Sequence, residues 1–329
     1  MEKSVKEMRE EMVSRLVSII ESRPLEWEAG WSNAGDTPHN AITQKNYNGF
    51  NFFFLLALQM EQGYADGRWL TFKQVQDLGG SVTKGQKSAQ IFYYREYDKN
   101  TKKDFDQKSI EKLTQEEQLI YKKENVVPVL RCSNVFNAKQ CENLPKAEKR
   151  VLTEQEIETQ RVAVMETVLE NNSVPIIHDG GSRAYYSWKE DAIHLPEKAA
   201  FKSMQDYYAT VLHEIAHSTG HKSRLDRNLQ TAKTAYAIEE LRAELGSVFM
   251  QNELGIKIEG RHFENHGAYL QSWLSEVKKD PGVFLEAVSA AGKIADYITV
   301  NYAQKNIKSE QLVIKPKELP RQQVVGRAR

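Results

Sequence analysis

The chain of 329 residues has few cysteines, no excess charge of either sign and no long hydrophobic run. Two cysteines, Cys132 and Cys141, exclude a disulfide framework, and we expect free thiols. Lys and Arg number 45, as do Asp and Glu, so nucleic-acid binding would need a local basic patch. No run is long enough to span a bilayer, and the N-terminal residues are charged and helical in pattern. We therefore expect a cytoplasmic protein without a membrane partner.

Residues 213–217 read His-Glu-Ile-Ala-His, which is the H-E-x-x-H signature of zinc peptidases. Two histidines four residues apart lie on one face of a helix, so His213 and His217 can bind one metal ion. Glu214 is then placed to accept a proton from the attacking water and is the candidate catalytic residue. Since charged helices contain this pentapeptide by chance, its flanking sequence matters.

The flanking sequence predicts a helix with a defined start and end. Ser203 followed by Asp206 fits an N-terminal cap, and Gly220 suits the position just after a helix. Apolar residues between these signals recur at helical spacing: Tyr208, Val211, Leu212, Ile215 and Ala216. The apolar face should pack on a core, while the two histidines, in the last two turns, line a cleft.

A catalytic zinc site needs a third protein ligand and an open position. The downstream candidates are His221, Asp226, Glu239, Glu240 and Glu244. His221 follows Gly220 too closely for the spacing of three-histidine peptidases, although it could line the cleft. Residues 237–245 predict a second helix on which Glu240 and Glu244 share a face.

This pair resembles the arrangement in the glutamate zincins, in which an acid four residues after the ligand orients a ligating histidine. The resemblance implies Glu240 as third ligand and Glu244 as the orienting acid; the reverse assignment is the main alternative. The expected ion is Zn²⁺, and imidazole and carboxylate ligands also accept Mn²⁺ or Co²⁺.

The order of expected elements indicates an α+β protein with two domains. We predict a first domain at 1–145, a linker at 146–152, a second domain at 153–310 and a basic, disordered tail at 311–329. The expected helices cover 3–21, 52–62, 71–79, 153–170, 236–252, 267–277 and 281–300. The expected strands cover 88–97, 126–136, 174–177, 184–187 and 192–195. Residues 98–124 are densely charged and predict a partly helical surface excursion.

The first domain has aromatic residues interleaved with Asn, Gly and Lys rather than an acid–base cluster. Single-strand binders combine basic grooves with aromatic rings, and each base stack contributes about 1–3 kcal/mol. Aromatic clusters more often form a core, so composition alone leaves both interpretations open.

Motifs in both halves resemble one known family. In the first half these are Trp27 with Trp31 and residues 38–40, 47–51, 69–74, 78–85 and 135–140. In the second half they are residues 184–186, Asp191, 195–196, 213–221, 224–227, 239–246 and 269–273. In order along nearly the whole chain, they look like ArdC-type antirestriction proteins, and similar first domains occur on conjugative-plasmid primases. The departures are a longer excursion at 98–124 and Ser218, where the family often has an aromatic residue.

The resemblance implies a mixed α/β domain that binds single-stranded DNA, joined to a zincin-like metallopeptidase domain. It also implies protection of incoming plasmid or phage DNA from host restriction. With the aromatic and basic pattern it gives these candidate DNA-binding residues: Trp31, Asn40, Tyr47, Asn51, Trp69, Lys73, Lys84 and Lys87.

Two functions remain open at this point. The first is a DNA-recruited zinc peptidase that cleaves a host restriction or defence protein. The second is a non-catalytic single-strand-binding protector with a structural metal site, for which Glu214 would be unnecessary. A metal-dependent nuclease fits less well, because nuclease sites favour carboxylate clusters that hold Mg²⁺ or Mn²⁺.

Overall fold

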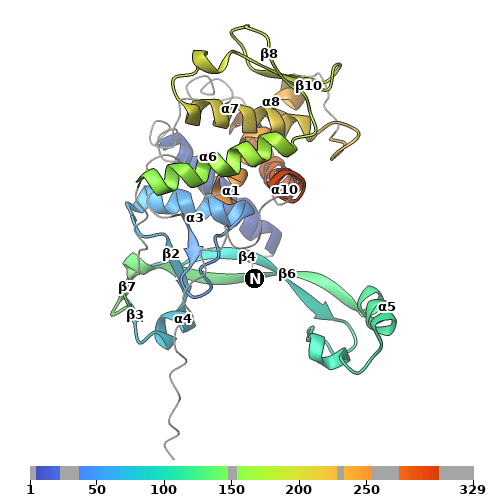
Figure 1. Cartoon of the computed structure of the whole chain (residues 1–329). Coiled ribbons are helices and arrows are strands. Elements are labelled where there is room, and N and C mark those ends of the chain that lie inside the picture. The colour runs from blue at the N-terminus through green and yellow to red at the C-terminus, as the bar shows by residue number, and fades with distance from the viewer. Residues whose placement is uncertain (1–4, 23–36, 147–153, 228–232, 254–273, 304–329) are drawn as a thin grey trace, which may run out of the picture.

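The computed structural model describes residues 5–22, 37–146, 154–227, 233–253 and 274–303 (Figure 1). Helices and small mixed sheets make up both halves of the chain, which confirms the predicted two-domain α+β class. The first residue of the helix expected at 153–170 lies outside the described residues. Most of the helix expected at 267–277, the tail and Trp31 also lie outside them.

The first half combines several helices with a five-stranded sheet and a small two-stranded sheet. Helix α1 spans Val5–Ser22, α3 spans Gly49–Gln62 and α4 spans Phe72–Asp77. The five strands are β1 (His39–Asn40), β2 (Arg68–Thr71), β4 (Ala89–Asp98), β5 (Lys103–Asp104) and β6 (Val126–Asn137). They lie in the order β1-β2-β6-β4-β5, and only β1 and β2 run parallel to each other. β3 (Ser81–Val82) pairs separately with β7 (Cys141–Glu142).

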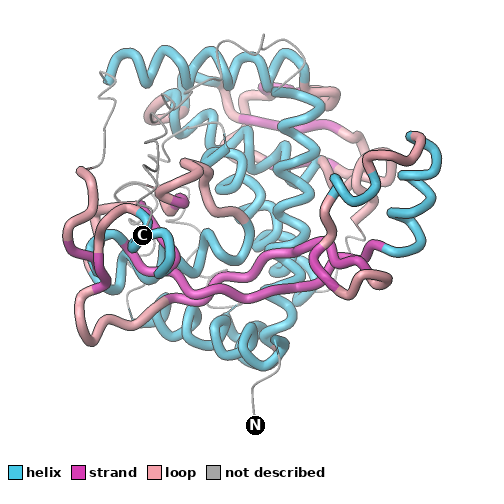
Figure 2. Tube along the Cα trace, turned by 90° about the horizontal axis from the view of Figure 1, so that it is seen from below, coloured by secondary structure: helices cyan, strands magenta, loops and turns pink. Residues whose placement is uncertain are grey.

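Strands β4 and β6 form a long antiparallel ribbon whose far end carries the charged excursion. The register runs from Ala89 opposite Val135 to Asp98 opposite Val126. Beyond it lie β5, a 3-10 turn at Gln107–Ile110 and helix α5 at Gln115–Asn125 (Figures 1 and 2). The Tyr121 hydroxyl of α5 donates to the Asp98 carboxylate over 2.9 Å, which ties the helix to the ribbon.

The second half places a three-stranded sheet over a group of helices (Figure 1). The strands are β8 (Ile176–His178), β9 (Tyr185–Ser187) and β10 (Ala192–Leu195), in the order β8-β10-β9. The helices are α6 (Glu154–Asn171), α7 (Met204–Ser218), α8 (Lys233–Glu253) and α10 (Pro281–Ile298). Residues 274–279 are helical too, and a π-helical turn at Thr299–Ala303 follows α10.

The two halves share one hydrophobic core, which sits between α3 and the helices of the second half. Phe53 of α3 is fully buried, with its ring 5.0 Å from that of Phe249 on α8 and 6.3 Å from that of Phe284 on α10. Phe52 contacts Phe249, and Phe50 contacts Phe284. The helix predicted at 52–62 therefore joins the two halves, and it packs against the helix that carries Glu240.

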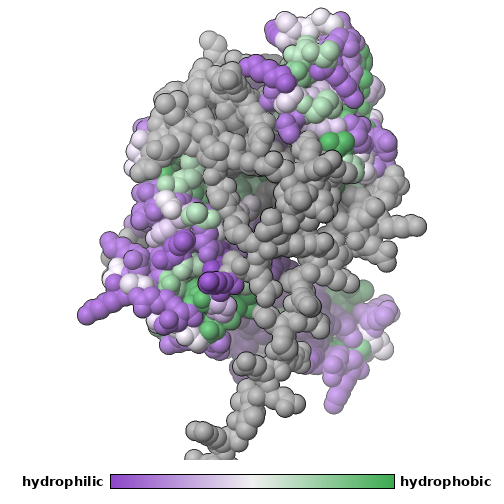
Figure 3. Space-filling model, turned by 60° about the vertical axis from the view of Figure 1, so that its left-hand side comes forward, coloured by the Kyte–Doolittle hydropathy of each residue, from purple (hydrophilic) through white to green (hydrophobic). Residues whose placement is uncertain are grey.

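Where Figure 3 shows described residues, most are hydrophilic, and small groups of hydrophobic residues lie between them. Among the described helices, none combines the length and apolar composition needed to cross a membrane.

Candidate metal centre

Helix α7 carries the H-E-x-x-H motif and has the predicted start. The Ser203 hydroxyl accepts a hydrogen bond from the Asp206 backbone N–H over 3.1 Å, which satisfies a free donor of the first turn. Val211, Leu212 and Ile215 are fully buried, so the apolar face packs on the core as expected. The helix therefore holds both histidines rigidly.

Gly220 lies just after the C-cap of α7, as predicted, but without the left-handed geometry common for glycine at that position. Thr219 closes the helix in right-handed geometry, and Gly220 does not take a positive φ. Its small size matters instead, because a Cβ there would lie 3.0 Å from both Arg227 Nη2 and the Trp188 ring. Glycine at this position thus leaves room for a guanidinium beside the last turn of α7.

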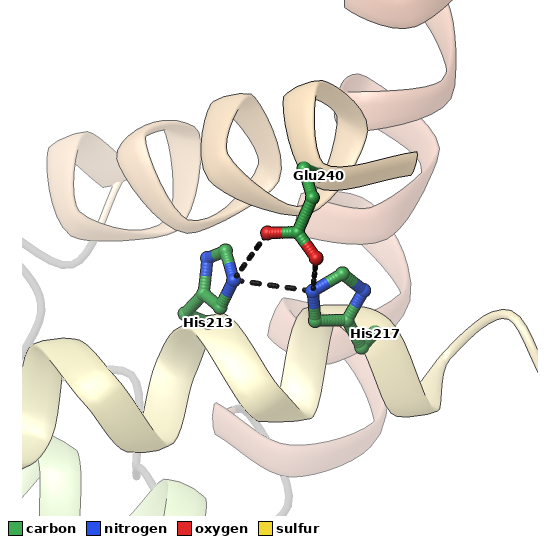
Figure 4. A group of neighbouring side chains, drawn as sticks. All are labelled: His213, His217 and Glu240. Carbon is green, nitrogen blue, oxygen red and sulfur yellow. Dashed lines mark hydrogen bonds and ion pairs between the residues drawn. The ribbon is translucent and has the colours of Figure 1, made fainter. Parts of the chain in front are cut away.

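His213, His217 and Glu240 converge on one point between α7 and α8 (Figure 4). The two Nε2 atoms are 3.1 Å apart. The Glu240 carboxylate lies 3.5 Å from His213 Nε2 and 3.4 Å from His217 Nε2. Metal–ligand bonds of about 2.0–2.2 Å in a tetrahedral site put ligand atoms about 3.4 Å apart. Donor types and spacing therefore both fit a single divalent ion.

The electrostatic environment also favours a cation at this point. Burial on its own would lower the pKa of His217, but the carboxylates of Glu239 and Glu240 and the charge of Glu214 raise it to about 10. Burial would raise the pKa of Glu240, yet the two histidines hold it far below its usual range. Three acids thus surround one imidazole, and a buried carboxylate needs a positive partner of this kind.

Glu214 is 7% exposed and lies on α7 between the two histidines in sequence. Glu244 lies one helical turn beyond Glu240. Burial raises the pKa of Glu244 to about 7; the charge of His213 lowers this pKa, and the charge of Glu240 raises it further. Of the two acids assigned on α8, Glu240 is thus the one whose carboxylate reaches both Nε2 atoms. His221 lies outside this group: its Nδ1 is 2.7 Å from the Ser223 hydroxyl.

Glu239, which the sequence offered only as one of several candidate ligands, and Arg227, which it did not propose for the site, also lie at the centre. Glu239 is 4% exposed, and its carboxylate lies 3.6 Å from Nδ1 of His217. Arg227 donates to that carboxylate over 2.7 Å. The available signal was the Arg-Leu-x-Arg stretch after the motif together with the adjacent acids at 239 and 240, whose partners become evident only in three dimensions.

Several candidate DNA-binding residues have structural roles in this fold. Trp69 is 1% exposed and donates from Nε1 to Gln59, so its ring offers no face to a base. The side chain of Asn51 bonds to both backbone groups of Phe92. Asn40 accepts from two backbone N–H groups of the following turn, and Tyr47 packs against the core. Of the described aromatic candidates, Trp69 and Tyr47 thus belong to the core or pack against it.

The remaining candidates, Lys73, Lys84 and Lys87, are exposed. Phe72, next to Lys73, is 52% exposed. Lys139 is exposed as well, and its neighbour Gln140 bonds to the backbone carbonyl of Lys87 over 2.9 Å. One exposed aromatic ring and several lysines therefore lie on α4 and on the loops around β3 and β7.

Known proteins match the chain along nearly its whole length. Residues 6–136 match the family described as the N-terminal domain of anti-restriction factor ArdC, and residues 163–290 match the zincin-like metallopeptidase family MPTase-PolyVal. The crystal structure of the antirestriction protein ArdC from plasmid R388, with Mn(II) bound, superposes with a TM-score of 0.68 at 30% identity. The superposition covers 90% of this chain and 98% of that one. For the metal-free structure of the same protein the TM-score is 0.66, at 29% identity over 90% of this chain and 97% of that one.

Two further relatives differ in length. A DNA primase TraC of Escherichia coli is 34% identical over 318 residues, which is 94% of this chain but 29% of the primase. The chain thus spans less than a third of that relative. The uncharacterized protein y4eC of Sinorhizobium fredii is 31% identical over 304 residues, covering 90% of this chain and 94% of that protein.

Proposed function

Because this chain belongs to the family of ArdC-type antirestriction proteins, we propose that it protects incoming single-stranded DNA from restriction and carries a metal-dependent peptidase site. The observation that carries the peptidase proposal is the convergence of His213, His217 and Glu240 beside Glu214. The alignment with an antirestriction protein over 98% of its chain supports the biological role.

The donor set suits Zn²⁺, Mn²⁺ or Co²⁺, and the solved relative holds Mn(II). A divalent ion at this position would act as a Lewis acid that polarises a peptide carbonyl and makes a nearby water more acidic. The protein's own contribution is a fixed set of two imidazoles and one carboxylate on two rigid helices, which leaves a fourth tetrahedral position open.

Glu214 acts as the general base in this proposal. It accepts a proton from the water that attacks the peptide carbonyl carbon, so that a C–O bond forms. It then delivers the proton to the amide nitrogen as the C–N bond breaks and the amine leaves. A purely structural metal site needs no such acid, and the near-complete burial of Glu214 favours this role over that of a solvated surface charge.

For DNA, we propose the surface formed by Phe72, Lys73, Lys84, Lys87 and Lys139. An exposed ring can stack on one base, and lysines around it can neutralise the backbone, a combination typical of single-strand binders. This replaces Trp69 with Phe72 as the stacking residue, because only an accessible ring can contact a base.

The test is protection of incoming conjugative DNA in a restricting host, at equal levels of folded protein. Glu214→Ala should lose protection, while Glu286→Ala, an exposed glutamate on α10, should retain it. Retained protection in Glu214→Ala would refute a peptidase role in antirestriction and support protection by DNA binding alone. Host proteins cleaved only in the presence of the intact Glu214 would identify the substrate.

A further inference from the structure

A buried ion pair joins the segment that follows α7 to α8. Arg227 follows α7, and its guanidinium donates to both carboxylate oxygens of Glu239 on α8, over 2.7 and 3.3 Å. The same guanidinium donates to the carbonyl of Ala216 over 2.9 Å and to the Thr219 hydroxyl over 2.6 Å. Arg227 therefore connects the last turn of α7 to α8 next to the candidate metal centre.

Glu239 completes this connection at the far side of one ligand. Its Oε1 atom lies 3.6 Å from Nδ1 of His217, while Nε2 of the same ring faces Glu240. When Nε2 binds a metal, Nδ1 carries the proton, and a carboxylate beside Nδ1 favours that tautomer and ring orientation. Glu239 is placed to do this because the guanidinium holds its carboxylate in a fixed position.

A stability role alone does not explain this pair well. The side chains of Arg227 and Glu239 are 9% and 5% exposed. Removing two charges from water costs several kcal/mol per ion, so a buried ion pair of this kind is often no more stabilising than apolar residues of the same size. Gly220 also leaves space for the guanidinium, since a Cβ there would approach Nη2 to 3.0 Å.

We propose that Glu239 and Arg227 are positioning residues for the metal ligand His217, with Glu239 orienting the ring and Arg227 holding Glu239. The inference rests on the proposed divalent-metal site. It assigns to Glu239 the role that the sequence pattern gives to Glu244, and it gives the second arginine of the Arg-Leu-x-Arg stretch a function.

The matched control is Arg224, the first arginine of that stretch. It donates to the carbonyl of Ser218 on α7 over 2.7 Å, and it pairs with Asp191 and Tyr186 of the β9–β10 hairpin. It thus braces the same end of α7 from the sheet side. A loss of metal binding caused by general loosening of α7 would appear in variants of both arginines.

The experiment measures Mn²⁺ affinity of the full chain by calorimetry for Glu239→Gln, Arg227→Lys, the double variant and Arg224→Lys. Glu239→Gln and Arg227→Lys should each bind Mn²⁺ about 10–100-fold more weakly than the wild type, because removal of a residue that orients a ligating histidine typically lowers metal affinity by this factor. The double variant should lose no more Mn²⁺ affinity than the single variant with the larger loss, because both substitutions break the same connection to His217. Arg224→Lys should stay within about threefold of the wild type, since its partners lie on α7 and the hairpin.

Co²⁺ absorption adds a readout that a merely structural role would not move. The d–d bands, which depend on ligand geometry, should change in Glu239→Gln and stay unchanged in Arg224→Lys. Wild-type affinity in Glu239→Gln, or additive losses in the double variant, would overturn the inference even if Arg227→Lys failed to fold. Glu240→Ala tests the premise separately: if neither it nor the wild type bound Mn²⁺, the proposed metal site itself would fail.

Discussion

The shared core between the two halves gives a prediction whose size follows from the structure. Phe53 is fully buried, and its ring lies within 5.0–6.3 Å of those of Phe52, Phe249 and Phe284. Truncation of a buried Phe to Ala costs about 3–5 kcal/mol, with the larger values where the cavity cannot collapse. Rings from three helices enclose this site, so we expect Phe53→Ala to cost about 4 kcal/mol, or about a thousandfold in the unfolding equilibrium.

The assay is urea unfolding followed by circular dichroism, together with amide hydrogen exchange of α3 and α8. A single core predicts that Phe53→Ala accelerates exchange in both helices, although the substitution lies in only one of them. Phe72→Ala is the matched control, because that ring is 52% exposed, and it should cost less than about 1 kcal/mol. Equal effects of the two substitutions, or unchanged protection of α8 in Phe53→Ala, would refute the shared core.

Three further predictions concern the site, the DNA surface and acid stability. Saturating Mn²⁺ should raise the melting temperature of the wild type and of Glu214→Gln but not that of Glu240→Ala, since a ligand that binds only the folded state stabilises that state. Thermal unfolding measured with and without a chelator tests this prediction. Phe72→Ala should weaken single-stranded DNA binding by about 1–3 kcal/mol. Lys73→Ala should reduce the slope of log affinity against log salt concentration by about 0.7. Fluorescence anisotropy measures both, and no change in either variant would exclude the proposed DNA surface. Burial on its own would raise the pKa of Asp66, but hydrogen bonds from a neighbouring arginine hold this pKa below its ordinary value. The ionised carboxylate therefore stabilises the folded state above the unfolded-state pKa of about 4, and this stabilisation is lost as the pH falls through the folded-state pKa. Acid unfolding curves should therefore fall less steeply for Asp66→Asn than for the wild type.

The position of α8 gives the shared core a functional meaning. This helix carries Glu240 towards the metal centre and, farther along, Phe249 towards α3 of the first half. The wall of the candidate peptidase site and the packing surface of the first domain are thus two parts of one helix. Substitutions at this junction should therefore affect metal binding as well as stability.

Elements with strong local signals match their predictions closely. The helix predicted at 52–62 occurs at Gly49–Gln62, where Gly63 ends it in left-handed geometry. The strand predicted at 88–97 occurs at Ala89–Asp98. The boundaries of the two domains remain predictions, because the core residues on α3 and α8 belong to both halves. The hydrophobic character of a residue predicts that it will be buried, but it does not predict which distant helix will pack against it.

Helical period and capping depend on neighbours a few residues apart, so the local sequence is enough to predict which side chains share a helix face and where the helices start. His213 and His217 converge for this reason, as does the start of α7 at Ser203. Which acid of α8 meets both imidazoles depends on the rotation of two helices and the distance between them, so it is evident only in the folded protein. The same holds for the contact of Arg227 with Glu239 and for the burial of Trp69, since packing between distant segments has no period in the sequence.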